Sequence, residues 1–280
     1  MKFGANTLIW TDAFGLEHLP LLDEVKQRGF DGIEVARFSF DGFPAAMIGR
    51  AAESIGLETI FCSALTGNLS MASEDADIRK KAFNFVASGV FTAAQIGAKT
   101  FVGPYCTPVG QLLGRRRTSD EWKRVVEGLQ RMGEVLDLHG VDLAIEPLNR
   151  FEAYFLNTAE DAVRLCEDVG HPRVGVLFDT FHANIEEKDL GRAIVTLGRH
   201  IKHVHTCEND RGIPGTGHIE WPCVFAALKQ IGYDDWVVIE SFGFAIEAIA
   251  AAACIWRDIA PTPEVIAWEG VKFLKKAAAA

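Results

Sequence analysis

The chain has 280 residues, of which 49% are hydrophobic and 24% are charged, a composition typical of soluble globular proteins. Its formal net charge of −10 and its pI near 5.3 argue against a nucleic-acid partner and against an anionic membrane surface, because both require a basic face. The most apolar tract, residues 242–256, contains Glu247 and is too short to span a bilayer.

Cysteine usage and the N-terminal residues bear on the compartment. The six cysteines form no CxxC pair and show no close spacing, which is typical of reduced thiols. A strand-like run follows Met1 and Lys2 directly, so no signal peptide is expected. We therefore expect a cytoplasmic protein.

Eight strand-like runs alternate with eight helical patterns along the chain. We expect strands at 3–9, 32–36, 59–64, 100–103, 142–146, 174–179, 201–205 and 236–240, and helices at about 16–28, 44–55, 74–96, 119–139, 159–169, 187–198, 222–231 and 245–258. Helix 119–139 has the clearest apolar stripe, and Thr118 with Glu121 predicts a capping box at its start. A glycine just past several helices predicts left-handed helix ends.

Eight strand–helix units joined by short turns predict a parallel sheet. No linker or change in composition divides residues 1–280, so we expect one domain. Closure of the eight units predicts an α/β fold of the (β/α)8 TIM-barrel type, with a C-terminal helical extension over residues 259–280. An open, doubly wound sheet is the alternative.

Four of the strand-like runs end in a candidate metal ligand. Glu146 closes the first and is followed by Pro147, which has no N–H for a strand ladder; GVLFD, IKHVH and WVVIE end at Asp179, His205 and Glu240. In a barrel, the C-terminal ends of these strands meet at one mouth. Three carboxylates and one imidazole suit a divalent ion such as Mn²⁺, Mg²⁺ or Co²⁺, and without it the carboxylates would repel one another.

Each of these residues also has a plain structural interpretation. Asp179 could simply cap the turn that follows it. His203 lies two residues before His205, and residues two apart on a strand share a face, so alternation alone cannot separate them. We prefer His205 because it stands at the strand end, in register with the other three candidates. The coincidence of four such strand ends favours a metal site.

The segments IEPLNRFE, FDTFHANIEE, HVHTCENDRGIPGTGHIEW and VVIESF together resemble the D-tagatose 3-epimerase family of xylose-isomerase-like TIM barrels, which includes the D-allulose (D-psicose) 3-epimerases. The resemblance spans nearly the whole chain. It implies a Mn²⁺- or Co²⁺-dependent homodimer or homotetramer that inverts C3 of a free ketose. The metal ligands implied are Glu146, Asp179, His205 and Glu240, and the residues implied to contact the substrate near O1 and O2 are Glu152, His182 and Arg211.

The chemistry of C3 inversion fits these residues. A proton next to the C2 carbonyl must be removed, and a proton must return from the opposite face. Glu146 and Glu240, on the fifth and eighth strands, are expected to flank the sugar as the two acid/base groups. Arg211 would add positive charge near the oxyanion, with a rim salt bridge to Glu208 or Asp210 as its alternative. His182 as a donor to O2 competes with a structural role.

Three further residues are expected to line the substrate pocket. Trp10 and Phe242 lie near strand ends and would wall the apolar faces of the sugar. Asn6 stands where several relatives carry an aromatic residue against the distal end of the sugar, and the loop 104–113 lacks a tryptophan that some members place there. These departures leave D-fructose/D-allulose, D-tagatose and L-ribulose as candidate substrates.

Other functions compete with this hypothesis. An aldose–ketose isomerase or an inosose-type dehydratase would use the same enediolate chemistry on the same barrel. An abasic-site endonuclease would need zinc-binding histidines at the third and fourth strand ends, but no histidine lies between His18 and His139. A non-catalytic sugar-binding protein is disfavoured by Glu146 and Glu240. The glycine-rich residues 212–217 lack the lysine and the context of a phosphate loop, which favours a free sugar.

Overall fold

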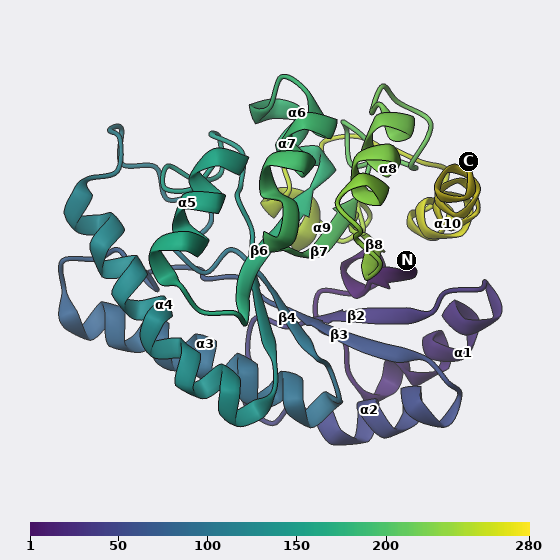
Figure 1. Cartoon of the computed structure of the whole chain (residues 1–280). Coiled ribbons are helices and arrows are strands. Elements are labelled where there is room, and N and C mark those ends of the chain that lie inside the picture. The colour runs from purple at the N-terminus through teal and green to yellow at the C-terminus, as the bar shows by residue number, and fades with distance from the viewer.

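The computed structural model describes residues 1–280, and its eight strands form one closed parallel barrel (Figure 1). Each strand pairs with the next along the chain, and β8 pairs with β1, so no sheet edge remains open. The strands are β1 Lys2–Asn6, β2 Gly32–Ala36, β3 Glu58–Cys62, β4 Thr100–Gly103, β5 Asp142–Ile145, β6 Val174–Asp179, β7 Ile201–Thr206 and β8 Trp236–Ile239. The predicted TIM barrel is confirmed, and the open doubly wound alternative is wrong.

Helices surround the barrel (Figure 1). They are α1 Leu19–Gln27, α2 Ala45–Ser54, α3 Ala76–Ile96, α4 Ser119–His139, α5 Ala159–Val169, α6 Thr180–Glu186, α7 Leu190–Leu197, α8 Trp221–Gln230, α9 Glu247–Ala252 and α10 Pro263–Ala279, with 3-10 turns at Thr7–Ile9, Leu16–His18 and Gly198–His200. The C-terminal helix α10 contacts β1, β8 and α8. It therefore covers the barrel where the last strand meets the first. No helix combines the length and the apolar character that crossing a membrane requires.

Local sequence signals explain where several elements begin and end. Thr118 and Glu121 form the predicted capping box at the start of α4. Gly97 and Gly140 end α3 and α4 with φ values of 89° and 65°, which glycine adopts without steric cost. The strand expected at 3–9 ends instead at Asn6, because its side chain accepts a hydrogen bond from the N–H of Leu8 and caps a 3-10 turn.

Two expectations about helices need correction. The helix expected at 245–258 is helical only over α9, and the chain leaves the helical conformation before Cys254, whose φ is +54°. Helix α6, which follows β6 without a loop, was not expected. Asp179 is at once the last residue of β6 and the N-cap of α6, since its Oδ1 accepts from the N–H of Phe181 (2.6 Å).

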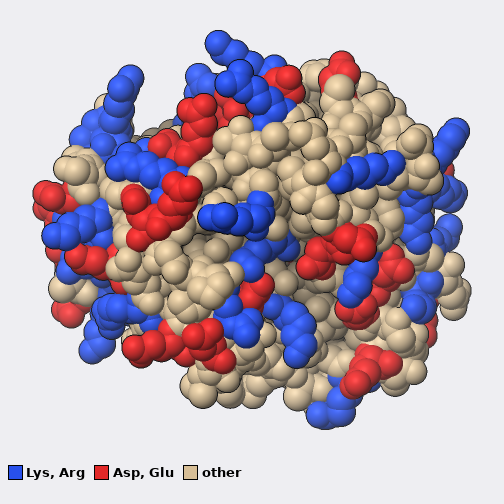
Figure 2. Space-filling model, viewed as in Figure 1, with Lys and Arg blue, Asp and Glu red and all other residues tan.

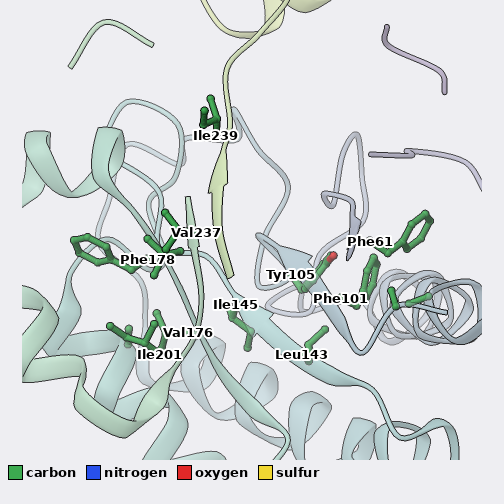
Figure 3. Close-up of a cluster of buried hydrophobic side chains, with 14 of the residues drawn as sticks. Phe61, Phe101, Tyr105, Leu143, Ile145, Val176, Phe178, Ile201, Val237 and Ile239 are labelled. Atoms are coloured by element: carbon green, nitrogen blue, oxygen red, sulfur yellow. The ribbon is translucent and has the colours of Figure 1, made fainter. Parts of the chain in front are cut away.

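The larger of the two apolar clusters joins the barrel to its helices. Phe61 on β3, Phe101 on β4 and Tyr105 stack at centroid distances of 5.5 and 4.8 Å (Figure 3). Gly89 lets α3 approach this stack, because a Cβ there would lie 2.3 Å from the ring of Phe101. Side chains from alternate strand positions, including Val102, Ala144, Leu177 and Val238, form the second apolar cluster, in the barrel interior.

The surface carries both signs of charge. On the face shown in Figure 2, Lys and Arg side chains are interspersed with Asp and Glu. No continuous basic patch covers this face, in keeping with the net charge of −10.

Candidate active site

Four polar side chains converge at the C-terminal mouth of the barrel. One ligand atom from each of Glu146, Asp179, His205 and Glu240 lies within 4.8 Å of the others, and all four residues are buried. Asp179 and His205 are paired in register on β6 and β7. Glu146 and Glu240 each come directly after the last residue of β5 or β8, so the expectation that they end their strands is off by one residue.

Strand alternation explains why these side chains meet. Successive side chains of a strand point to opposite faces, so each ligand faces the same way as the residue two positions earlier. Those earlier residues include Ala144, Leu177 and Val238, which pack together in the barrel interior. The backbone N–H of Glu146 still donates to the carbonyl of Gly103 (3.1 Å), which holds it in line with β4. The ligands therefore form a polar layer on top of an apolar one.

Arg211 pairs with two carboxylates of the cluster and brings a positive charge to it. Its Nη1 donates to Asp179 Oδ2 (2.8 Å) and to Glu240 Oε2 (3.0 Å), and the residue is only 4% exposed. The guanidinium lies over the rings of Phe181 and Phe242, with its central carbon 4.1 and 4.8 Å from the two centroids. Its backbone has φ +65°, unusual for a residue other than glycine.

The alternative placement of Arg211 in a rim salt bridge is wrong. Asp210 pairs with Arg257 instead (3.0 Å), at an exposed site. Glu208 is fully buried, and its Oε1 accepts from Trp221 Nε1 (2.6 Å) and from the N–H of Gly215 (2.7 Å). Glu208 thus holds together the loop between β7 and α8, which carries Arg211.

Burial and mutual charge shift the pKa values of the cluster in different directions. Burial, together with the charges of Glu240 and Asp179, raises the pKa of Glu146 well above its usual range. For Asp179, burial acts upward, but the Arg211 guanidinium and the nearby histidines hold the pKa well below its usual range. For His205, burial acts downward, but Glu240 and another carboxylate, Glu34, raise the pKa. One arginine therefore compensates only part of the negative charge.

The residues present fit a divalent cation. Glu146 Oε1 and His205 Nδ1 are buried and have no hydrogen-bond partner in the protein. When Glu146, Asp179 and Glu240 are ionised and His205 is neutral, as metal ligands are, one guanidinium leaves an excess of two negative charges. Such buried charge requires compensation, and without a cation it favours protonation, which is the direction in which the pKa values of Glu146 and His205 are shifted. Oxygen and imidazole donors without a thiolate suit Mn²⁺, Co²⁺ or Mg²⁺.

The structure links the predicted substrate residues Glu152 and His182 to this cluster. His182 Nδ1 accepts from the N–H of Asn149 (3.1 Å), and His182 Nε2 lies 3.5 Å from Glu146 Oε1. Glu152 Oε1 accepts from Asn149 Nδ2 (2.8 Å), and Arg211 Nη2 lies 3.0 Å from His182 Nε2. Burial lowers the pKa of His182 to about 4, so its ring is neutral at neutral pH.

The three expected pocket-lining residues differ in placement. Phe242 is half-buried and lies against Arg211. Trp10 is half-buried and packs on Trp268 (centroids 5.3 Å apart), and its indole N–H has no partner. Asn6 is fully buried, and its Nδ2 donates to Glu34 Oε1 (2.6 Å). The structure therefore does not bring Asn6 into the four-residue cluster.

Sequence reasoning gave no role to Glu34 or Asn149, and it named Glu208 only as a possible salt-bridge partner of Arg211. Glu34 lies on β2, fully buried, with its two carboxylate oxygens 2.8 Å from His203 Nε2 and 2.9 Å from His205 Nε2. Burial acts upward on its pKa, but the two histidines hold the pKa well below its usual range. The signal that could have found Glu34 is a lone charge in the otherwise apolar run GIEVA.

Comparisons with known proteins agree with this site. The family described as xylose isomerase-like TIM barrel matches residues 22–277. The chain is 36% identical over 276 residues to a probable ketose 3-epimerase of Synechocystis sp., covering 99% of this chain and 96% of the relative. It is 31% identical over 264 residues to the D-psicose 3-epimerase of Ruminiclostridium cellulolyticum, covering 92% of this chain and 90% of that one.

A solved L-ribulose 3-epimerase superposes with a TM-score of 0.94 at 27% identity, covering 99% of this chain and 94% of the other. A D-psicose 3-epimerase crystallised with D-tagatose superposes with a TM-score of 0.91 at 29% identity, covering 99% of both chains. Sequence and fold thus agree over nearly the entire length. The chain belongs to the xylose isomerase-like TIM barrel family and, within it, to the ketose 3-epimerases, which are isomerases.

Proposed function

We propose that the protein is a metal-dependent enzyme that inverts C3 of a free ketose. The observation that carries the proposal is the buried cluster of Glu146, Asp179, His205 and Glu240 at the mouth of the barrel. Relatives named D-psicose 3-epimerase and L-ribulose 3-epimerase support the choice of substrate class.

The four residues of the cluster would hold Mn²⁺, with Co²⁺ or Mg²⁺ as the alternatives. Glu146 Oε1 and His205 Nδ1, which lack a partner within the protein, would become ligand atoms. When bound, the ion supplies Lewis-acid polarisation of the ketose carbonyl and stabilises the negative charge of the enediolate.

Glu146 and Glu240 are the proposed acid/base pair. They follow β5 and β8, with β6 and β7 between them, so their carboxylates reach the cluster from different sides of the barrel. One carboxylate takes the C3 proton, and the electrons of the C–H bond form the C2–C3 double bond of a planar cis-enediolate. The other carboxylate then returns a proton to the opposite face of C3, which restores the C2 carbonyl with inverted configuration.

The surrounding residues would orient the sugar. Arg211 brings a permanent positive charge to the side of the cluster where negative charge develops, and Glu152 and His182 would hydrogen-bond near O1 and O2. Trp10 and Phe242 would wall the apolar faces of the ring or chain. These contacts favour the reactive conformer of the ketose over others.

The proposal includes a free rather than a phosphorylated sugar. The glycine-rich residues 212–217 pack around the protein's own carboxylate, since the N–H of Gly215 donates to Glu208 Oε1 (2.7 Å). This N–H is therefore not available for a phosphate group. A cytoplasmic homodimer or homotetramer completes the proposal, and sedimentation velocity would test the assembly.

The decisive experiment incubates the Mn²⁺-loaded protein with D-fructose, D-tagatose and L-ribulose in deuterated water. Deuterium at C3 of a new epimer is the expected result; label at C1 of an aldose would identify an aldose–ketose isomerase, and loss of water a dehydratase. Glu146→Gln and Glu240→Gln should each lower turnover at least about 10²-fold, because each removes a general acid/base group. Full turnover by Glu240→Gln would refute the two-carboxylate mechanism.

A matched control comes from a buried carboxylate elsewhere in the chain. Glu121 on α4 is buried and bonded to Arg115 (2.9 and 3.0 Å), and it belongs to none of the candidate metal clusters. Glu121→Gln therefore tests the general effect of neutralising a buried glutamate. Its turnover per folded molecule should match that of the unaltered protein.

A further inference from the structure

Glu34 stands at the centre of a buried network that joins three strands. Its Oε1 accepts from Asn6 Nδ2 on β1 (2.6 Å) and lies 2.9 Å from His205 Nε2 on β7, while its Oε2 lies 2.8 Å from His203 Nε2. Glu34, His203 and His205 are all fully buried. No Lys or Arg side chain pairs with this carboxylate, so histidine and amide groups provide its compensation.

The two nitrogens of the His205 ring face different partners. Nε2 faces Glu34, and Nδ1 faces the four-residue cluster, 3.3 Å from Glu240 Oε2 and 4.0 Å from Asp179 Oδ2. An ionised carboxylate only accepts hydrogen bonds, so the contact with Glu34 requires a proton on Nε2. A metal ligand is the neutral imidazole, which carries one proton, so a proton on Nε2 leaves Nδ1 with the lone pair that a metal needs.

We propose that Glu34 is a positioning residue that holds the Nε2 proton of His205 and thereby presents an unprotonated Nδ1 to the metal. The inference rests on the proposed function, because it concerns the ion of that site. Histidine ligands commonly donate their second ring N–H to a carboxylate, which fixes the ring and raises its basicity. Here the carboxylate comes from β2, a strand that contributes no ligand of its own to the four-residue cluster.

The rest of the network keeps the Glu34 carboxylate from turning. Asn6 is itself fixed, because its Oδ1 accepts from the N–H of Leu8 (2.9 Å) while its Nδ2 holds Glu34 Oε1. His203 Nε2 lies 2.8 Å from the other oxygen, as a close contact without hydrogen-bond geometry. This arrangement also separates the two histidines of β7: His203 faces Glu34 but is absent from the four-residue cluster, whereas His205 contacts both.

A purely structural role for Glu34 is a poor explanation of these contacts. Burying an ionised carboxylate costs several kcal/mol unless it is well compensated, and an apolar or amide residue would fill the position at less cost. Ile60, Ala36 and Val102 show that the barrel interior accepts apolar side chains nearby. A carboxylate facing His205 Nε2 holds the proton on that nitrogen and does so more firmly than a neutral acceptor would.

The first test measures metal affinity without using turnover. Isothermal titration calorimetry with Mn²⁺ should show a 10- to 100-fold weaker affinity for Glu34→Gln, because the amide holds the Nε2 proton less firmly. The matched control is Glu121→Gln, whose affinity should be unchanged. An affinity of Glu34→Gln within about twofold of the unaltered protein would overturn the inference, since typical losses at such positions exceed that.

A second measurement keeps the inference testable if Glu34→Gln fails to fold. Long-range ¹H–¹⁵N NMR of the unaltered, Mg²⁺-loaded protein reports which nitrogen of His205 carries the proton. A proton on Nε2 supports the role of Glu34, and a proton on Nδ1 overturns it. The two proposals can fail separately. If no C3 epimer forms, but Mn²⁺ affinity is normal in the unaltered protein and His205 carries its proton on Nε2, the proposed reaction is refuted and this inference stands.

Discussion

Arg211→Met offers a direct thermodynamic test of the cluster. The methionine keeps an unbranched side chain between the rings of Phe181 and Phe242 but removes the charge that pairs with Asp179 and Glu240. Loss of one partner from a buried ion pair typically costs about 3–5 kcal/mol, a large share of a total stability of about 5–15 kcal/mol. We expect the metal-free variant to lose stability of this size.

Saturating Mn²⁺ should reduce the loss. A dication at the cluster would neutralise the same carboxylates, so the remaining effect of Arg211→Met should be that of the lost hydrogen bonds, about 1–2 kcal/mol. Urea denaturation followed by tryptophan fluorescence, with EDTA and then with Mn²⁺, measures both values. Equal losses in the two conditions would refute the idea that guanidinium and ion share one set of carboxylates.

Arg150→Met is the matched control for this comparison. Arg150 pairs with Glu186 (2.9 Å), but its side chain is 60% exposed, and it forms no ion pair with the four-residue cluster. Exposed ion pairs contribute only about 0–1 kcal/mol, so the variant should lose little stability with or without Mn²⁺.

Three further predictions concern single residues. Burial and neighbouring carboxylates raise the pKa of Glu146, so the folded metal-free protein keeps a proton that the unfolded chain releases near pH 4.5. The stability of the metal-free protein should therefore fall as the pH rises above that value. Urea titrations at several pH values should show that Glu146→Gln removes this part of the fall. His182→Asn should lower kcat/KM about 10- to 100-fold through a lost substrate hydrogen bond, with Mn²⁺ affinity in calorimetry unchanged. Glu208→Gln should cost about 1–3 kcal/mol in urea denaturation and speed proteolysis of residues 209–218, because the amide replaces a buried carboxylate that accepts from Trp221 and Gly215.

Much of the fold was predictable because its signals are local. Strands β2, β4 and β6 and helices α4 and α5 have the predicted bounds, and each is marked by an apolar run or by a cap within a few residues. The secondary-structure predictions fail where the same local sequence pattern is compatible with two structures. The alanine-rich run at 245–253 is a good helix former, yet only six of its residues, α9, are helical. The helix that contacts β8 and β1 is α10.

The residues of the candidate site also differ in how visible they are in the sequence. Strand ends are visible in the sequence, so Glu146, Asp179, His205 and Glu240 could be proposed together. The strand-end criterion does not select Glu34, because this residue precedes the end of β2 by two residues, and its partner His205 lies 171 positions away in the chain. For Asp179, the expected cap is confirmed, because Oδ1 accepts from the N–H of Phe181 at the start of α6. Its Oδ2 pairs with Arg211, and its role as a metal ligand stays a prediction.

The inward direction of His203 and His205 depends on a feature that no periodicity reveals. The register between β6 and β7 shifts by one residue after Val176: Val176 pairs with Ile201, but Leu177 pairs with His203. Val176 and Ile201 belong to the larger apolar cluster, between the barrel and its helices, whereas Leu177 belongs to the cluster in the barrel interior. Lys202 is the extra residue of β7 between the two pairs. Because of it, Ile201 faces the helices while His203 faces the barrel interior.

This irregularity brings the second half of β7 into line with the mouth of the barrel. With the shift, Asp179 pairs with His205, and His205 pairs with Val238 on β8. Without it, Asp179 would stand opposite Val204, and a slip of one residue turns every side chain of a strand to the other face. The inward direction of both histidines, and with it the contact of each with Glu34, thus follows from one extra residue near the base of β7.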